Sequence, residues 1–440
     1  MIIKRTPLAV FVMFQLLCCS AFAENSLQPS GEQSTQAGEG ALQEQVEALL
    51  KRINELEAKK TKVSELSEKE VVTTGSPLAL RLSGQLNRAV VWHSNGKNSN
   101  TVHADVDNSP SRLNITAVGN LSEQTKIFAV IEEAFEPNST DRIDVHDAND
   151  NQPFTNRKME VYIDDKKWGR LFIGQGSTAS DGTMEDVDMS GTSVVSAGSS
   201  VSFSGAGIQF FDRTTGAKAL LNGQRMIVET VFDSGDGLFR RNRIRYDTPE
   251  FYGLRLQTSH YYKGRNDNRD IAFKYAGTAN GIKIGAQGAY LRRLSKTVSV
   301  PGGSTPAKYH QFNGSLGVLF TNGISIFLSA LHRDWKSGRT RNGSIYFAKL
   351  GYQHSFIEAG KTAFAVDYGE YKNLIFDTRP ENERDQYKGT SYGVMLTQFL
   401  DRIATELFIA GRLYRLDGPS RQPARYKDAK LVLSGMRVKF

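Results

Sequence analysis

The feature that most constrains this 440-residue chain is a long series of segments in which apolar and polar residues alternate. In the segment ALRLSGQLNRAVVW, Leu80 and Leu82 lie on one face of a strand and Arg81 lies on the other. Side chains of a strand point alternately to its two faces, so a period of two indicates strands that separate an apolar from a polar environment.

We identify sixteen such segments between residues 79 and 440. They begin near Ala79, Pro110, Gln124, Asn156, Trp168, Phe239, Phe251, Asn268, Gly281, Tyr309, Gly323, Arg341, Ala359, Gln386, Arg402 and Asp428. Tight turns such as DDKKW and TNG alternate with longer polar stretches, namely 93–109, 135–154, 178–238, 294–308 and 373–385. An even strand number with turns at one rim and loops at the other is typical of outer-membrane barrels. The sequence therefore predicts an all-β fold, a transmembrane 16-stranded antiparallel β-barrel over 79–440.

Composition agrees with this fold and excludes others. Only 39% of the residues are hydrophobic, and beyond residue 23 no apolar run approaches the roughly 20 residues of a membrane-spanning helix. Barrel strands need only about 10 residues of alternating character. The excess of basic residues is 55 − 47 = 8, which is too weak for so long a chain to indicate a nucleic-acid partner.

The chain begins with a segment that is typical of secretory signals. Lys4 and Arg5 supply its positive charge, Leu8 to Leu17 its apolar core, and Ala21 to Ala23 the cleavage site, which predicts a signal peptide at 1–23. Both cysteines lie within it, so the mature chain has none and is held together without disulfides.

A polar stretch at 24–40 indicates a flexible linker, and 67–78 a second one. Between them, at 41–66, apolar residues follow 4-3-4-3 spacing, which indicates a short coiled coil and hence self-association. The alternative is a single amphipathic helix that lies on another surface. The predicted coiled-coil core is Leu42, Val46, Leu49, Ile53 and Leu56.

The chain ends in LVLSGMRVKF, which is itself a strand with a terminal phenylalanine. Because every backbone N–H and C=O must be paired in lipid, we expect the last strand to pair with the first, near Ala79. Phe440 would then lie at the boundary of the bilayer, where aromatic residues are favourable.

Four stretches together make residues 79–440 resemble the trimeric Gram-negative outer-membrane porins. They are SRLNITAVGNLSEQTKIFAVIEEAF, NRKMEVYIDDKKWGRLFIGQG, NRIRYDTPEFYGLRLQTSHYY and SGMRVKF. The resemblance implies a homotrimer, a third loop (178–238) folded into the lumen to narrow the pore, and a role for Phe440 in the signal that the barrel-assembly machinery reads. The N-terminal extension is similar to porin-like channels with a periplasmic coiled coil, including those for dicarboxylic acids.

The same resemblance places opposite charges across the pore. The third loop carries the acids Asp181, Glu185, Asp186 and Asp188. The predicted basic wall comprises Arg112, Arg243 and Arg245 at lumen-facing parity, with Arg81, Lys126 and Lys158. Such a field would favour polar solutes in a narrow aqueous gap. The alternative is that the acids are merely solvated and the arginines pair locally. Whether residues 201–238 form a hairpin inside the lumen or outside it remains an open question.

Nothing in the sequence favours catalysis. The seven histidines are scattered without an H-x-x-x-H pair, so we predict no enzyme activity, no cofactor and no metal. The hypothesis is a passive channel for small hydrophilic solutes and ions. Alternatives are a channel selective for small anions such as carboxylates, an envelope tether that contacts the cell wall through the N-terminal segment, and a surface receptor. Outer-membrane lipid and lipopolysaccharide are the expected surroundings.

Overall fold

The computed structural model describes residues 70–72, 78–146, 154–221, 223–264, 266–294, 297–300, 303–336, 341–375, 386–418 and 425–440. The chain divides into two compact units, Met1–Ser67 and Glu68–Phe440, and every described residue belongs to the second. The predicted signal peptide, the linker at 24–40 and the coiled coil at 41–66 lie outside the described residues. Within the predicted linker at 67–78, a short strand β1 (Glu70–Val72) pairs with the start of the barrel.

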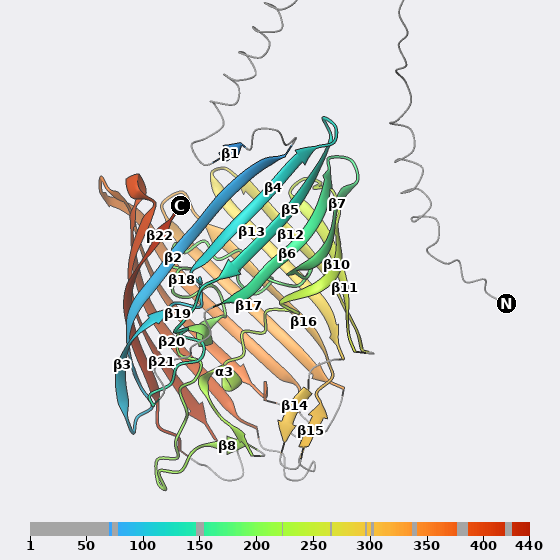
Figure 1. The fold of residues 1–440 in the computed structure, drawn as a ribbon. Coiled ribbons are helices and arrows are strands. Elements are labelled where there is room, and N and C mark those ends of the chain that lie inside the picture. Colours follow the sequence, from blue (N-terminus) through green and yellow to red (C-terminus); the bar gives the residue numbers. More distant parts are fainter. Residues whose placement is uncertain are drawn as a thin grey trace, which may run out of the picture. The chain divides into compact units, whose positions relative to one another are not determined.

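The second unit is a closed antiparallel β-barrel (Figure 1). Its strands are β2 (Ala79–Ser94), β3 (Ser99–Asp105), β4 (Arg112–Asn120), β5 (Thr125–Ala134), β6 (Thr155–Asp165), β7 (Gly169–Ser177), β10 (Arg240–Asp247), β11 (Leu254–Lys263), β12 (Asn266–Ala279), β13 (Ile282–Arg293), β16 (Tyr309–Leu319), β17 (Ile324–Trp335), β18 (Gly343–Ile357), β19 (Gly360–Lys372), β20 (Lys388–Leu400), β21 (Thr405–Asp417) and β22 (Ala429–Lys439). Because β3 and β4 pair with successive halves of β2, they share one position, and the barrel has 16 strands. The predicted fold is confirmed.

One stretch differs from the sequence expectation. Residues 93–109, which we expected to form a loop, contain the end of β2 and all of β3. In β3 the alternation is inverted, since Val102 and Ala104 are buried toward the lumen whereas Thr101 and His103 are exposed on the outer face. A strand with polar outward residues lacks the apolar outer face that identified the others, so it was read as a polar loop.

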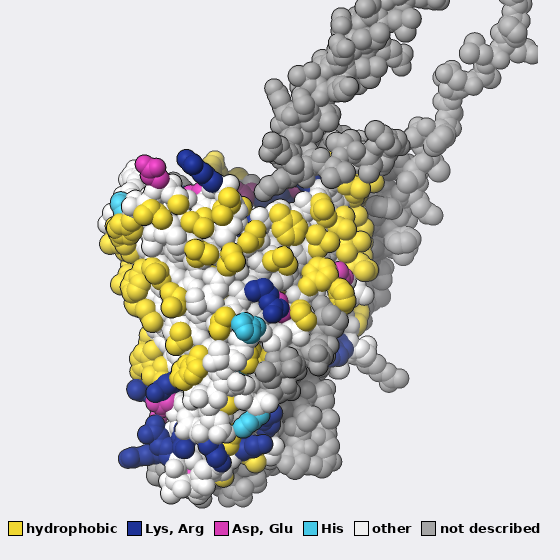
Figure 2. Space-filling model, turned by 60° about the vertical axis from the view of Figure 1, so that its left-hand side comes forward, with side chains coloured by type: hydrophobic (Ala, Val, Ile, Leu, Met, Phe, Trp, Pro, Cys, Tyr) yellow, Lys and Arg dark blue, Asp and Glu magenta, His cyan; other side chains and the backbone are white. Residues whose placement is uncertain are grey.

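Elsewhere the outer face of the barrel is apolar. On β17, Ile324, Ile326 and Leu328 are exposed, and the intervening Ser325 and Phe327 are buried. Figure 2 shows such hydrophobic side chains spread over the wall, with Lys and Arg gathered at the rim below. This alternation is what lipid outside and polar or packed groups inside require. Among the described residues, no helix is long and apolar enough to cross a membrane.

The barrel closes through the last residue. The N–H of Gly84 donates to the Phe440 carbonyl at 2.8 Å, and the N–H of Phe440 donates to the Gly84 carbonyl at 3.0 Å. Strand β22 pairs with β2 from Gln85 to Ser94, so the predicted pairing of the last strand with the first is confirmed. The Phe440 ring covers Gly84 at the rim of the short turns, where the C-terminus lies (Figure 1).

Residues 178–238, which we call the insert, fold into the lumen. The insert contains η1 (Val201–Ser204), β8 (Leu220–Leu221), β9 (Gln224–Arg225) and α3 (Val228–Val231). It has an apolar core of its own, in which the Phe232 ring lies 5.1 Å from the ring of Tyr371 and 5.0 Å from that of Tyr414, both on the inner wall. The question left open for 201–238 is thereby answered, because most of this region packs inside the barrel. A further hairpin, β14 (Thr297–Val300) and β15 (Gly303–Pro306), projects from the loop rim.

Closure at Gly84 gives a testable prediction. A Cβ added to Gly84 would lie 2.6 Å from the Phe440 ring and 2.7 Å from the Arg112 carbonyl, so Gly84→Ala should destabilise the barrel by about 1–3 kcal/mol. The matched control is Gly411→Ala, whose Cβ would meet only Val394 at 3.6 Å. The measurement is the temperature at which the compact, heat-modifiable band is lost on a denaturing gel. Equal temperatures for the two variants would contradict this account of closure.

Candidate constriction in the barrel lumen

The insert leaves a polar cavity of about 330 Å³ beside the wall formed by β4, β6, β10 and β22. On the insert side its lining includes five carboxylates: Asp181, Glu185, Asp186, Asp188 and Asp236. On the wall side it includes four guanidinium groups: Arg112, Arg157, Arg240 and Arg437. The segment between β3 and β4 completes the lining with residues 107–110. Opposite charges therefore face one another across this cavity, which we call the passage.

The carboxylates of the insert are held by its own turns and by the far wall. Asp236 accepts the N–H groups of Gly182 at 2.8 Å and Met184 at 3.0 Å, which fixes the first turn of the insert. Asp188 pairs with Lys349 of β18 at 2.6 Å, and both side chains are buried. The insert is thus attached to the wall opposite the passage by an ion pair with almost no access to solvent.

Burial and neighbouring charges shift the pKa values of several of these acids. Burial, and next the charge of Asp186, raise the pKa of Glu185 to about 7. Burial and then the charge of Glu185 raise the pKa of Asp236 well above its usual range. Across the passage, burial and the nearby Asp141 likewise raise the pKa of Asp107. Burial by itself would raise the pKa of Asp188, but the charge of Lys349 together with hydrogen bonds from Lys349 and Ser190 lowers that pKa below its usual value.

The arginines of the wall differ in their pairing. Arg157 donates to Glu132 at 2.8 Å, and Arg437 donates to Glu406 at 3.0 Å and to the Ser109 hydroxyl at 2.6 Å. In the part of the chain that the structure describes, neither Arg112 nor Arg240 forms an ion pair. These two guanidinium groups keep their hydrogen-bonding capacity for a passing solute.

The structure brings some predicted site residues together and not others. All four predicted loop acids and Arg112 line the cavity. Arg243 and Arg245 lie outside its lining in local ion pairs, with Glu160 at 2.5 Å and Asp247 at 2.7 Å respectively, as the alternative of local pairing anticipated. The remaining predicted cations also lie outside it: Lys158 is 3.5 Å from Glu132, and Arg81 and Lys126 are exposed near the short turns.

Sequence reasoning missed Arg157, Arg240, Arg437 and Asp236. Arg157 lies at an irregularity where Glu132 pairs with Lys158 but Glu133 pairs with Asn156, so simple alternation does not give its direction. Arg240 begins β10 directly after Phe239, whose φ of 58° turns the chain out of the insert. Of these four residues, only Arg437 could have been predicted to face the lumen, because it lies on the charged face of the last strand.

The fold and this passage define a class: a membrane-spanning barrel whose lumen is narrowed to a charged passage. The Gram-negative porin family matches residues 70–418, and the chain belongs to this family. It is therefore an outer-membrane channel for passive diffusion, located in the bacterial outer membrane. The family and the fold are those of channel proteins rather than enzymes. In the described part of the chain, no three His, Cys, Asp or Glu side chains are grouped to hold a metal ion.

Solved structures show the same fold at low sequence identity. The anion-selective porin from Comamonas acidovorans is 14% identical with a TM-score of 0.55, and the match covers 82% of this chain and 100% of that chain. The outer membrane channel DcaP of Acinetobacter baumannii is 10% identical with a TM-score of 0.51, covering 84% and 99%. OprB of Pseudomonas putida is 11% identical with a TM-score of 0.51, covering 82% and 94%. No curated protein matches the sequence.

Glu185 gives a pH prediction. Its raised pKa of about 7 means that the side chain is neutral below that pH and adds a negative charge to the passage above it. Its surroundings are Asp181, Asp186, Asp236 and Arg240. The cation-to-anion permeability ratio should therefore rise between roughly pH 6 and pH 8.

The measurement is the reversal potential of single channels in a salt gradient at several pH values. Glu185→Gln should remove the rise, and Glu358→Gln, at an exposed short turn, should keep it. The same pH dependence in wild type and in Glu185→Gln would contradict the assignment.

Proposed function

We propose that the passage between the insert and the wall sets the selectivity of this channel and that it favours small anions, carboxylates included. The observation that carries this proposal is the imbalance of pairing across the passage. Arg112 and Arg240 have no ion-pair partner among the described residues, whereas Asp188 is paired with Lys349 and Asp186 with Lys274 at 2.8 Å. Glu185 and Asp236 have raised pKa values. Asp181, the remaining acid of the lining, has no ion pair among the described residues, so a permeating anion meets two unpaired guanidinium groups and, apart from the two acids with raised pKa values, one unpaired carboxylate.

The packing of the insert directs permeating solutes through this passage. The apolar core of the insert fills the lumen against β17 to β22 and the neighbouring β2 and β3, and Phe232 packs on Tyr371 and Tyr414 there. A hydrophilic solute does not enter a packed apolar core. Its path therefore runs along the polar side of the lumen, next to Arg112 and Arg240. Focusing of the field in a narrow aqueous gap with low-dielectric walls strengthens the effect of each charge.

The proposal is tested by ion selectivity. Arg112→Gln and Arg240→Gln should each lower the anion-to-cation permeability ratio, because each removes an unpaired positive charge from the passage. Arg402→Gln, at a short turn, is the control and should leave the ratio unchanged. Permeability ratios come from reversal potentials in a salt gradient. Block by added carboxylates that saturates would support a selective site, and unchanged ratios in both variants would refute the proposal.

The outer wall near β2 and β3 supports a homotrimer. Arg88 lies on the outer face between Leu86 and Val90, its side chain is 48% exposed, and it pairs with Asp105 at 2.6 Å. His103 is exposed next to it, opposite Val90. Figure 2 shows basic, acidic and histidine side chains within the hydrophobic wall on this side of the barrel. A charge on the lipid face near the midplane costs about 2–4 kcal/mol, so this face is better covered by a neighbouring subunit than by lipid.

Arg88→Leu tests the subunit contact. If another subunit covers this face, the substitution should lower the temperature at which oligomers dissociate on a native gel, while the monomer barrel stays folded. Val90→Leu, at the adjacent outward position, is the control. An oligomer that is unchanged and a barrel that is more stable would show that lipid covers Arg88.

Other partners are part of the same proposal. The exposed Phe440 ring at the short-turn rim supports its role in the signal for the barrel-assembly machinery. Lipid and lipopolysaccharide surround the barrel. Contact of the N-terminal segment with the cell wall remains a prediction from sequence.

A further inference from the structure

One part of the wall side of the passage lies outside the barrel sheet. Residues 106–111, between β3 and β4, lie on the lumen side of β2, and we call them the ledge. Gln85 of β2 donates to the carbonyls of Ser109 and Pro110 at 3.0 and 2.9 Å, and Asn87 donates to the Ser109 carbonyl at 2.9 Å. Gln85, Asn87 and Ser109 are buried. The ledge is therefore fixed to the wall by amide groups that have few other partners.

On the insert side, residues 190–198 form a segment that we call the strap. Two buried cations hold it to the wall at β18 and β21. Lys349 donates to the Ser196 carbonyl at 2.5 Å, and Arg412 donates to the Ser196 hydroxyl at 2.9 Å. Lys349 also pairs with Asp188, just before the strap. Because a buried cation that loses a partner is costly, the strap is fixed at Ser196.

Asn108 joins the ledge to the strap. Its Nδ2 donates to the Ser193 carbonyl at 2.5 Å, and its Oδ1 accepts the N–H of Ala197 at 3.2 Å. One planar amide thus uses its donor and its acceptor on the two sides of Ser196. Across the described part of the chain, no other hydrogen bond joins the ledge to the strap. We call this pair of hydrogen bonds the clamp.

A second contact of the near wall with the insert lies beyond the strap. Thr140, between β5 and β6, donates to the Phe203 carbonyl at 2.5 Å, and its own carbonyl accepts the N–H of Ala206 at 3.3 Å. The Thr140 hydroxyl also accepts the N–H of Asp107 at 3.0 Å, which supports the ledge. These bonds hold residues 203–206 and not the strap, so the separation of ledge and strap depends on Asn108.

We propose that Asn108 sets the width of the passage and thereby the largest solute that the channel admits. Asn108, Ser193 and Ala197 all line the passage, together with Arg112 and Arg240. Pore diameter and the charge of the lining are separate determinants of selectivity. The Asn108 side chain is neutral, so it acts on size, whereas the two arginines act on charge. The inference rests on the proposed function, because it takes the passage as the path of permeation.

Asn108→Leu separates the clamp from the bulk of the side chain. Leucine has the branched shape of asparagine but makes neither hydrogen bond, so the Ser193 carbonyl and the Ala197 N–H must turn to water. The strap then draws away from the ledge and the passage widens. Asn108→Ala removes both the bonds and the bulk, so it should widen the passage further. The matched control is Asn322→Leu at a short turn, which removes a hydrogen bond to the Ile324 N–H at 3.1 Å, far from the passage.

The experiment is liposome swelling with the refolded full-length protein and three neutral sugars: glucose, sucrose and raffinose. The rate for raffinose relative to glucose should rise severalfold in Asn108→Leu and in Asn108→Ala, and stay at the wild-type value in Asn322→Leu. Single-channel conductance should rise in the same two Asn108 variants. The preferred sign of ion should stay that of wild type, since no charge is removed. Retention of the heat-modifiable band shows that each variant is folded.

The outcomes distinguish this inference from the proposed function. An unchanged raffinose-to-glucose ratio in both Asn108 variants would overturn the clamp, and so would a rise in Asn108→Ala alone, because bulk and not hydrogen bonding would then limit the width. If the ratio is unchanged while Arg112→Gln still lowers the anion preference, the proposed function stands without the clamp. If Arg112→Gln and Arg240→Gln change nothing while the ratio rises, the passage selects by size and the proposed charge selectivity fails.

Discussion

The structure depends on the requirement that no backbone hydrogen-bonding group faces lipid unpaired. The pairing of β22 with β2 closes the barrel and meets this requirement. The reciprocal hydrogen bonds between Gly84 and Phe440 complete that pairing. Glycine at position 84 is a consequence, because the carbonyl of Arg112 and the ring of Phe440 leave no room for a side chain. The same requirement fixes the register of every strand, and register decides which side chains face the lumen. The charged passage is thus set by the closure of the barrel as much as by the residues that line it.

A second constraint is the packing inside the barrel. The insert buries its apolar core against the wall, and buried charges attach it there: Lys349 binds Asp188, and Arg412 binds both oxygens of Asp367 and the hydroxyl of Ser196. Buried ion pairs add little net stability, because desolvation offsets their attraction. They do disfavour any arrangement that leaves one partner alone, and so they select one position of the insert. That position removes Asp188 from the charge available to solutes, and the balance in the passage shifts toward its arginines.

How far the sequence predicts this structure depends on how far alternation holds. All sixteen strands were predicted near their observed starts because lipid outside and a polar lumen inside impose a period of two. The prediction failed at β3, where Thr101 and His103 point outward. For the site, alternation placed Arg112 but gave no direction for Arg157, which lies at a register shift. The core of the insert could not be predicted from a pattern, because it forms from irregular chain whose partners are distant in sequence, such as Phe232 and Tyr414.

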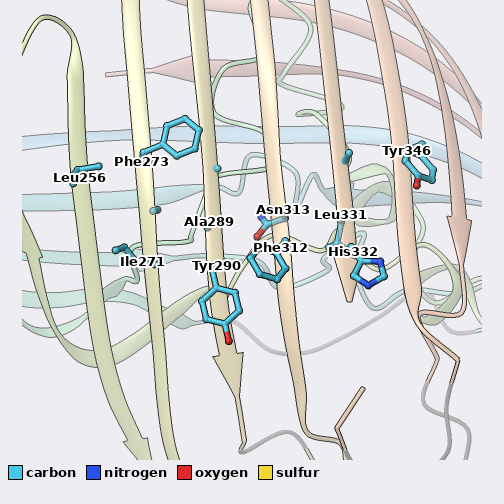
Figure 3. A pocket seen from close by; sticks show the side chains of 13 residues that line it. Leu256, Ile271, Phe273, Ala289, Tyr290, Phe312, Asn313, Leu331, His332 and Tyr346 are labelled. Atoms are coloured by element: carbon cyan, nitrogen blue, oxygen red, sulfur yellow. The ribbon is translucent and has the colours of Figure 1, made fainter. Parts of the chain in front are cut away.

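The failure at β3 and the apolar hollow of about 620 Å³ on the outer wall of β11 to β18 (Figure 3) show two different ways in which the outer surface departs from a uniform apolar band. At β2 and β3 the outward groups include Thr101, His103 and the ion pair of Arg88 with Asp105, which lipid penalises and a protein partner accepts. On β13 to β17 the outward groups are apolar but recessed, which lipid accepts and a flat protein surface fills poorly. A barrel selected only for burial in lipid would have neither feature, since large apolar side chains would serve equally well all round. In the proposed homotrimer the two faces have different neighbours, a second subunit at β2 and β3 and lipid elsewhere.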